Sequence, residues 1–262
     1  MRTRRWSWLT LLAPLGLGLV LLLGWYLTTA PGTIPAFLLP TPGGVARALW
    51  AGLVTQGGLW APMGMTVLEA LAGALAGFVV ALPLAILIYR SKLVSAAVLP
   101  FLGATQAIPA VALAPLLVLW AGYGLTGIVA LCALMVFFPI LVSTVIGLRH
   151  LDGDILAAAQ VDGAGGITRL VYIELPLALH AILGGVRNGF TLSVTGAVVG
   201  EMVMGGTGLG SLLFAQYHAF DTAAMFATII VLAVIAATIY SVVSLAERRW
   251  STLDNPPEGN SR

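Results

Sequence analysis

Three ionisable side chains interrupt long apolar stretches of the sequence, and these are the residues most able to do chemistry. Glu69 lies about seven residues into one stretch, Glu201 lies near the end of another, and Arg187 follows Pro176 by eleven residues. At 1.5 Å per helical residue, Arg187 would lie about 16 Å and Glu69 about 10 Å deep in a membrane. Charged groups at such depths are rare and mark transport pathways or ion pairs.

Each of these residues has two interpretations. Arg187, with Asn188 beside it, either lines a pathway and attracts an anionic group or pairs with Glu69 and joins two helices. Glu201 either shapes a gate at the outer end of its helix or accepts a hydrogen bond from the glycine-rich turn at 205–210. The residue types leave these alternatives open. We therefore treat Glu69, Arg187, Asn188 and Glu201 as pathway or gate candidates.

Patterns that would indicate an enzyme are missing from the sequence. There is no G-x-x-x-x-G-K-[ST] loop, so nucleotide hydrolysis would require another polypeptide. The spacing of His150, His180 and His218 supports no metal site, and the single Cys132 rules out an intramolecular disulfide. No set of nucleophile and base is present either. We predict a non-enzymatic protein with no metal or cofactor of its own.

The composition indicates the environment that positions these residues. Of the 262 residues, 60% are hydrophobic and only 8% are charged, with a mean hydropathy of +1.03. A soluble domain has roughly 25% charged residues, so this chain has too few to cover a water-exposed surface. The net charge of +2 is too small to suggest a nucleic-acid partner. We predict an all-α, polytopic protein of the lipid bilayer.

Six apolar stretches are long enough to cross a membrane, which takes about 20 residues each. They lie at about 9–27, 62–89, 97–120, 126–148, 177–204 and 222–245. The first is longer than the core of a typical signal peptide, so we predict an uncleaved helix in residues 1–28. An extracytoplasmic loop at 29–61, a transmembrane domain at 62–250 and a disordered cytoplasmic tail at 251–262 would follow.

The basic residues predict the orientation of these spans. If both termini are cytoplasmic, only Arg47 lies in an outer loop. Nine basic residues then fall on the cytoplasmic side: Arg2, Arg4, Arg5, Arg90, Lys92, Arg149, Arg169, Arg248 and Arg249. Cytoplasmic loops of membrane proteins are enriched in Lys and Arg, so the inverted orientation is disfavoured. We predict that the N- and C-termini are cytoplasmic.

One long segment between the fourth and fifth spans is polar, and it contains four of the ten acidic residues. Its alanine-rich part, 156–160, favours a helix. Gly163, Gly165 and Gly166 would end that helix and allow a sharp turn. We expect a second short helix at 167–175, separated by Pro176 from the fifth span. Two short helices joined by a glycine hinge at a membrane surface suit docking to a partner protein.

The segment also carries a motif: Ala158 and Ala159, then Asp162-Gly163-Ala164, then Ile173, Leu175 and Pro176. It resembles the cytoplasmic signature loop of binding-protein-dependent ABC importer permeases, E-A-A-x-x-x-G followed after a gap by I-x-L-P. The similarity covers about residues 37–250 and is greatest to the sulfonate, taurine and nitrate branch. Further matches are Leu39-Pro40-Thr41-Pro42, Pro109, Ala114-Pro115-Leu116, Trp120, Phe138-Pro139-Ile140, Gly184 to Gly189, Glu201-Met202 and Gly208-Leu209-Gly210.

This resemblance implies the ABC importer permease fold and a coupling segment at 149–176 that docks on an ATPase subunit. The residues it implicates are Ala158, Ala159, Asp162, Gly163, Ala164, Arg169, Ile173, Leu175 and Pro176. It also implies a homodimer in a prokaryotic cell membrane, an extracytoplasmic solute-binding protein, and ATP and Mg bound by the ATPase. The chain departs from the pattern at Ala157, where the family usually has glutamate, and at Glu69, where relatives often have a basic residue.

The alternative is a secondary transporter or channel driven by an ion gradient. Such proteins often have internal repeats and broken helices at the midplane, and the two halves of this chain show no convincing repeat. The substrate stays open. The branch implies small oxyanions, and its relatives also move vitamins and their precursors, such as riboflavin or the pyrimidine of thiamine.

Overall fold

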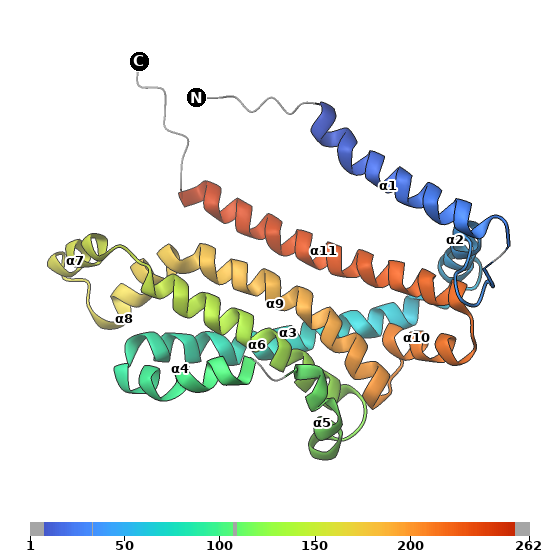
Figure 1. Ribbon diagram of the computed structural model, residues 1–262. Coiled ribbons are helices and arrows are strands. Elements are labelled where there is room, and N and C mark those ends of the chain that lie inside the picture. The colour runs from blue at the N-terminus through green and yellow to red at the C-terminus, as the bar shows by residue number, and fades with distance from the viewer. Residues whose placement is uncertain (1–7, 33, 107–108, 255–262) are drawn as a thin grey trace. The chain divides into compact units, whose positions relative to one another are not determined.

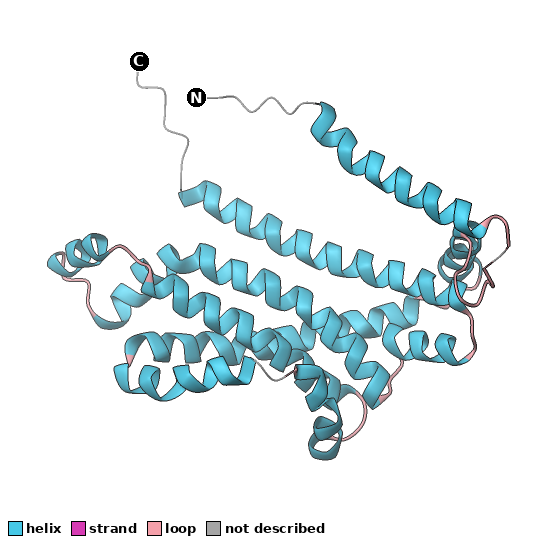
Figure 2. Ribbon diagram, viewed as in Figure 1, coloured by secondary structure: helices cyan, strands magenta, loops and turns pink. Residues whose placement is uncertain are grey.

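The computed structural model describes residues 8–32, 34–106 and 109–254, and the regular structure in these ranges is helical throughout (Figures 1 and 2). The helices are α1 (Trp8–Thr29), α2 (Pro42–Trp50), η1 (Ala51–Thr55), α3 (Trp60–Arg90), α4 (Lys92–Gln106), η2 (Ala110–Leu113), α5 (Ala114–Ala121), α6 (Leu125–Arg149), α7 (Gly153–Val161), α8 (Gly166–Arg169), η3 (Leu170–Glu174), α9 (Leu175–Met204), α10 (Leu209–His218) and α11 (Thr222–Asp254).

Four stretches of helix are long and apolar enough to cross a membrane: Trp60–Arg90, Leu125–Arg149, Gly166–Met204 and Thr222–Glu247. They coincide with the expected second, fourth, fifth and sixth spans. The expected first span also forms a helix, α1. The last of the long helices, α11, continues to Asp254, so the prediction that the tail begins to be disordered at 251 is wrong for residues 251–254. The rest of that tail lies outside the described residues.

The expected third span is not one continuous helix. After α4, the chain passes through the 3₁₀ turn η2 into the short helix α5. Pro109 stands at the N-cap of η2 in an extended conformation, and Pro115 occupies the first turn of α5. Proline lacks a backbone N–H and is tolerated in the first turn of a helix rather than in its interior. The two prolines therefore divide this apolar stretch into separate helices.

The described chain divides into two compact units, and each has its own packing. The first consists of residues 1–60 and 212–231, the second of residues 61–211 and 232–262. In the first unit, the indole N–H of Trp25 donates to the carbonyl oxygen of Pro40 at 2.9 Å, and its ring packs against Phe226. The proline-rich loop is thereby joined to the end of α1 and the beginning of α11.

In the second unit, α6 and α9 run side by side through extensive contact (Figure 1). Small residues on α9 make this possible. A Cβ at Gly185 would lie 2.9 Å from the carbonyl oxygen of Pro139, and one at Gly196 would lie 3.1 Å from the Cα of Cys132. Because lipid chains are as apolar as side chains, membrane helices associate by such close packing of small residues.

The α3 helix packs against α6 in the same way. A Cβ at Gly77 would lie 2.7 Å from the carbonyl oxygen of Ala133 and 3.1 Å from the Cβ of Val136. Gly73, four residues earlier, makes the same kind of approach, since a Cβ there would lie 3.0 Å from the carbonyl oxygen of Val129. By contrast, a Cβ at Gly64, also on α3, would have no neighbouring atom within 4 Å.

We predict that Gly77→Ala destabilises the protein, because the added methyl group collides with the backbone of α6. Overpacking of this kind typically costs about 1–3 kcal/mol of unfolding free energy. Gly64→Ala is the matched control on the same helix, and it should be neutral or slightly stabilising because alanine favours helix. Thermal unfolding of both variants in detergent measures the difference, and equal midpoints would contradict the packing described here.

Candidate functional site

The polar segment after α6 begins with α7, whose two ends are well defined. Asp152 is its N-cap residue and accepts a hydrogen bond from the backbone N–H of Asp154 at 2.9 Å. At the other end, the N–H of Ala164 donates to the carbonyl oxygen of Ala159, and Gly163 takes the left-handed conformation with φ +84°. Glycine adopts this conformation without steric cost, so the predicted glycine turn is confirmed.

The second short helix continues directly into the fifth span. The α8 turn passes into the π-helical turn η3 and then into α9, so residues from Gly166 to Met204 form one continuous helix. The prediction that Pro176 separates the two is wrong. Pro176 lies in the first turn of α9, and the wider π-helical turn precedes it. Such single π turns inside long helices are rare and frequently mark functional sites.

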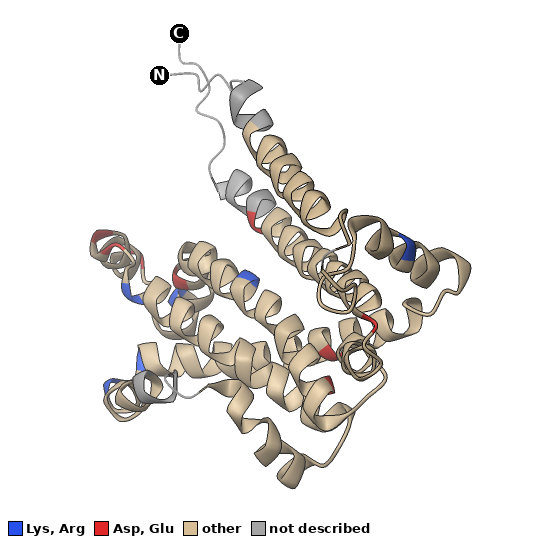
Figure 3. Ribbon diagram, turned by 45° about the vertical axis from the view of Figure 1, so that its right-hand side comes forward, with Lys and Arg blue, Asp and Glu red and all other residues tan. Residues whose placement is uncertain are grey.

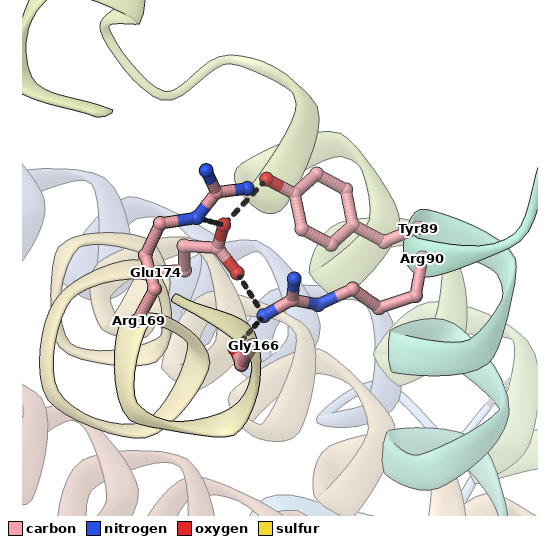
Figure 4. A network of polar contacts seen from close by, with 5 residues as sticks. All are labelled: Tyr89, Arg90, Gly166, Arg169 and Glu174. Carbon is pink, nitrogen blue, oxygen red and sulfur yellow. Dashed lines mark hydrogen bonds and ion pairs between the residues drawn. The ribbon is translucent and has the colours of Figure 1, made fainter. Parts of the chain in front are cut away.

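The buried carboxylate of Glu174 holds this segment on the end of α3 (Figure 4). Its Oε1 accepts a hydrogen bond from Nε of Arg169 at 2.8 Å and from the hydroxyl of Tyr89 at 3.2 Å. Nη2 of Arg90 lies 3.0 Å from its Oε2, and the same nitrogen donates to the carbonyl oxygen of Gly166 at 2.8 Å. We call these five residues the Glu174 cluster.

The cluster stabilises a carboxylate that has no contact with water. The side chain of Glu174 is 0% exposed, whereas those of Arg90 and Arg169 are 30% and 25% exposed. An isolated buried carboxylate would be costly, and charge-assisted hydrogen bonds offset that cost. Arg90 ends α3 and Arg169 ends α8, so the pairing fixes one element against the other.

The sequence prediction included Arg169 in the coupling segment but missed Glu174, Arg90 and Tyr89. A signal for Glu174 was present, because it is the single acidic residue in the apolar run Leu170–Leu177. Its partners Arg90 and Tyr89 are 84 and 85 residues away in the sequence, and no local pattern connects them to Glu174. In Figure 3, acidic positions colour the ribbon red on α7, and basic positions colour it blue on α8 and at the nearby ends of α3 and α4.

The coupling segment also carries three large apolar side chains that are strongly exposed. Val161 is 88% exposed, Ile167 is 79% exposed and Tyr172 is 76% exposed. Among the predicted residues, Ala158, Asp162, Gly163 and Pro176 are exposed, Ala164, Ile173 and Leu175 are partly buried, and Ala159 is buried. Large exposed apolar side chains beside exposed polar ones are typical of a protein–protein interface.

Arg187 does not pair with Glu69. Its Nη1 donates to Oε2 of Glu247 on α11 at 2.9 Å, and its guanidinium lies over the ring of Tyr240, 5.3 Å from the centroid. Nδ1 of His180 lies 3.5 Å from the other oxygen of Glu247. The prediction that Arg187 forms an ion pair is therefore confirmed, but its partner is Glu247 and not Glu69. This ion pair joins α9 to α11.

Asn188, the next residue, is exposed and lines a cavity of about 610 Å³. The cavity lies between the broken third apolar stretch, α6 and α9. Its lining is Pro109, Ala110, Leu113, Leu134, Met135, Phe138, Pro139, Val142, Ser143, Asn188 and Leu192. Ser143 and Asn188 are its polar side chains, and the lining includes no charged residue.

Glu69 and Glu201 are both buried, 0% and 1% exposed. Glu201 accepts hydrogen bonds from the backbone N–H groups of Gly210, at 2.5 Å, and Ser211, at 3.3 Å. The predicted bond between Glu201 and the glycine-rich turn is confirmed. Among the described residues, no group of three or more His, Cys, Asp and Glu side chains is placed to hold a metal ion.

The helical fold and the membrane-length helices define a polytopic membrane protein with a braced polar segment. Residues 73–252 match the family described as binding-protein-dependent transport system inner membrane component. The chain belongs to this family of ABC importer permeases and is a component of the inner membrane. Permease subunits of this kind are transport components. The family name implies a binding protein as a partner, and membership among ABC permeases implies an ATPase.

Among curated proteins, the chain is 40% identical to the riboflavin transport system permease protein RibX of Chloroflexus aurantiacus, over 94% of this chain and 92% of that one. It is 29% identical to the putative aliphatic sulfonates transport permease protein SsuC of Bacillus subtilis, over 98% and 91%. A solved inward-facing structure of the MetNI methionine ABC transporter has a similar fold. The TM-score is 0.64 at 18% identity, over 80% of this chain and 98% of that chain.

We predict that Glu174→Ala loosens the coupling segment, because Arg169 and Arg90 lose their shared partner. Hydrogen bonds to charged groups contribute about 1.5–3 kcal/mol each, and the partial exposure of both arginines places the loss near the lower end. The thermal unfolding midpoint should fall, and proteolytic cleavage within residues 149–176 should become faster. Asp154→Ala is the control, since Asp154 is exposed and forms no ion pair in the described chain. Unchanged cleavage in Glu174→Ala would contradict the bracing role.

Proposed function

We propose that this chain is the membrane-spanning permease subunit of an ATP-driven importer. Two copies would form the translocation pathway, two ATPase subunits would bind and hydrolyse ATP with Mg, and an extracytoplasmic binding protein would deliver the solute. Each chain would cross the membrane six times, with both termini in the cytoplasm. Family membership and the curated relatives support this assignment.

The observation that carries the proposed coupling mechanism is the Glu174 cluster, which braces a segment with exposed apolar side chains. In our proposal, the ATPase docks on α7, α8 and η3 through Val161, Ile167 and Tyr172. Movement of the docked helices is then passed on by two routes. One is the continuous helix from α8 to α9, and the other is the ion pair between Glu174 and Arg90 at the end of α3.

The solute is proposed to be an uncharged heterocyclic molecule of the vitamin type rather than a small oxyanion. The charge of Arg187 is already balanced by Glu247, so it is poorly placed to attract an anion. The cavity beside Asn188 offers an amide, a hydroxyl and a large apolar lining, which suits a ring system with a few hydrogen-bonding groups. The name of the 40% identical relative, a riboflavin permease, agrees with this class.

The alternative, a secondary transporter that works without an ATPase, is distinguished by purification. In mild detergent, we expect the chain to be isolated from its own membranes with a nucleotide-binding ATPase in about equal amount. Uptake by reconstituted liposomes should then require ATP. Recovery of the chain alone, with uptake that needs only an ion gradient, would reject the importer.

We predict that Gly163→Pro uncouples the permease. Proline is fixed near φ −65° and cannot adopt the +84° of Gly163, so the turn between α7 and α8 must change shape. ATP-dependent uptake of radiolabelled riboflavin should fall by at least about tenfold, while insertion into the membrane is retained. The matched control is Gly153→Pro at the first position of α7, where proline is favoured. Equal uptake by the two variants would contradict the coupling role.

We also predict that Asn188→Leu selectively weakens transport of a hydrogen-bonding solute. The change keeps a similar volume but removes the amide from the cavity, so riboflavin uptake should fall by about tenfold if one hydrogen bond is lost. Uptake of taurine should remain at background in both the original protein and the variant. Strong taurine uptake by the original protein would exclude the vitamin class.

A further inference from the structure

Two buried carboxyl groups meet in the second unit at the end of α9 that precedes the glycine-rich turn. Glu69 comes from α3 and Glu201 from α9, and both are buried. Thr66 lies three residues before Glu69 on the same face of α3 and donates to Oε1 of Glu201 at 2.7 Å, which brings the two carboxyl groups to the same place. Neither forms an ion pair with a lysine, arginine or histidine among the described residues. Two negative charges buried together in an apolar surrounding would repel each other and lack solvation, so a compensating positive charge is required.

Glu201 is well supplied with hydrogen-bond donors. Its Oε1 accepts from the hydroxyl of Thr66 at 2.7 Å, and its Oε2 accepts from the N–H groups of Gly210 and Ser211. The hydroxyl of Thr66 in turn accepts from the N–H of Leu209 at 2.8 Å. These N–H groups begin α10, and a negative charge is stabilised at the start of a helix. Glu201 is therefore the member of the pair suited to be ionised.

Glu69 is in the opposite situation. Both of its carboxyl oxygens are buried, and neither accepts a hydrogen bond in the described structure. The other titratable side chain facing the pair is Cys132 of α6, whose thiol donates to the carbonyl oxygen of Ser193 at 3.4 Å. No group in the described surroundings therefore supplies Glu69 with a donor or a charge of opposite sign.

We propose that Glu69 and Glu201 form a binding site for a single proton, with neutral Glu69 donating a hydrogen bond to ionised Glu201. A neutral carboxyl group is a donor as well as an acceptor, and an ionised carboxylate has about four acceptor positions. Glu201 can therefore accept this bond in addition to its three others. One proton resolves both the repulsion and the missing hydrogen bond.

The protonated pair would connect α3 to the turn between α9 and α10. Glycines make room for it: a Cβ at Gly208 would collide with the carboxylate of Glu201, and one at Gly210 would lie 2.9 Å from its Oε2. The motif Gly208-Leu209-Gly210 thus allows the backbone to wrap around the carboxylate. Thr66, one turn before Glu69 on α3, bonds to the same group, so both α3 residues hold the turn.

The proton can be observed by infrared spectroscopy of the complete transporter in lipid nanodiscs. We expect a C=O stretching band of a protonated carboxyl group at neutral pH, shifted on exchange into heavy water. The band should be absent from Glu69→Gln and retained in the control Asp221→Asn, which changes an exposed acidic residue. Because the amide of Gln also donates to Glu201, Glu69→Gln should unfold near the original temperature, whereas Glu69→Ala should unfold earlier.

A band that persists in Glu69→Gln, or no band in the original protein, would overturn the proposal. A second measurement needs no variant and distinguishes a proton from a metal cation. The band should be the same in sodium chloride and in choline chloride. A band that appears only when sodium is removed would show that the pair binds sodium instead.

Discussion

The burial of Glu174 between two arginines is the interaction on which the polar segment depends. A carboxylate without exposure to water is stable only where hydrogen-bond donors or positive charges replace the lost water, and here two arginines do so. Arg90 reaches it from the last turn of α3, and Arg169 reaches it from the last turn of α8. The segment is therefore tied to a second helix as well as to the helix that it continues into. In the coupling proposed above, movement of α7 and α8 would reach α3 through this side chain and α9 through the continuous helix.

The ionisable residues deeper in the apolar helices follow the same rule with different partners. Arg187 is neutralised by Glu247 and covered by the ring of Tyr240, so α9 and α11 are joined by a charge pair. Glu201 is stabilised by backbone N–H groups at the start of α10. In each case the charged group connects segments that the apolar sequence alone would hold only by dispersion and shape. The cavity beside Asn188 is thereby left with polar but uncharged side chains.

Local sequence patterns predicted the helical parts of the fold well, because each depends on neighbouring residues. Apolar length predicted α3, α6, α9 and α11, and glycine conformation predicted the turn at Gly163. Predictions about prolines were less successful. Pro176 was expected to break a helix, yet the helix continues through it from the π-helical turn η3 into α9. A local π-helical turn is one way in which a membrane helix accommodates a proline. The local sequence did not predict this turn.

The sequence by itself determined that this is an all-helical membrane protein with a conspicuous polar segment, since hydropathy and helix signals are properties of short stretches. It also identified the costly residues Glu69, Arg187 and Glu201. Only the tertiary structure decided their partners, because ion pairs form between positions far apart in the chain. Glu174 pairs with Arg90, which is 84 residues away in the sequence, and Arg187 pairs with Glu247, which is 60 residues away. Electrostatic pairing depends on distance in space, which no local spacing encodes.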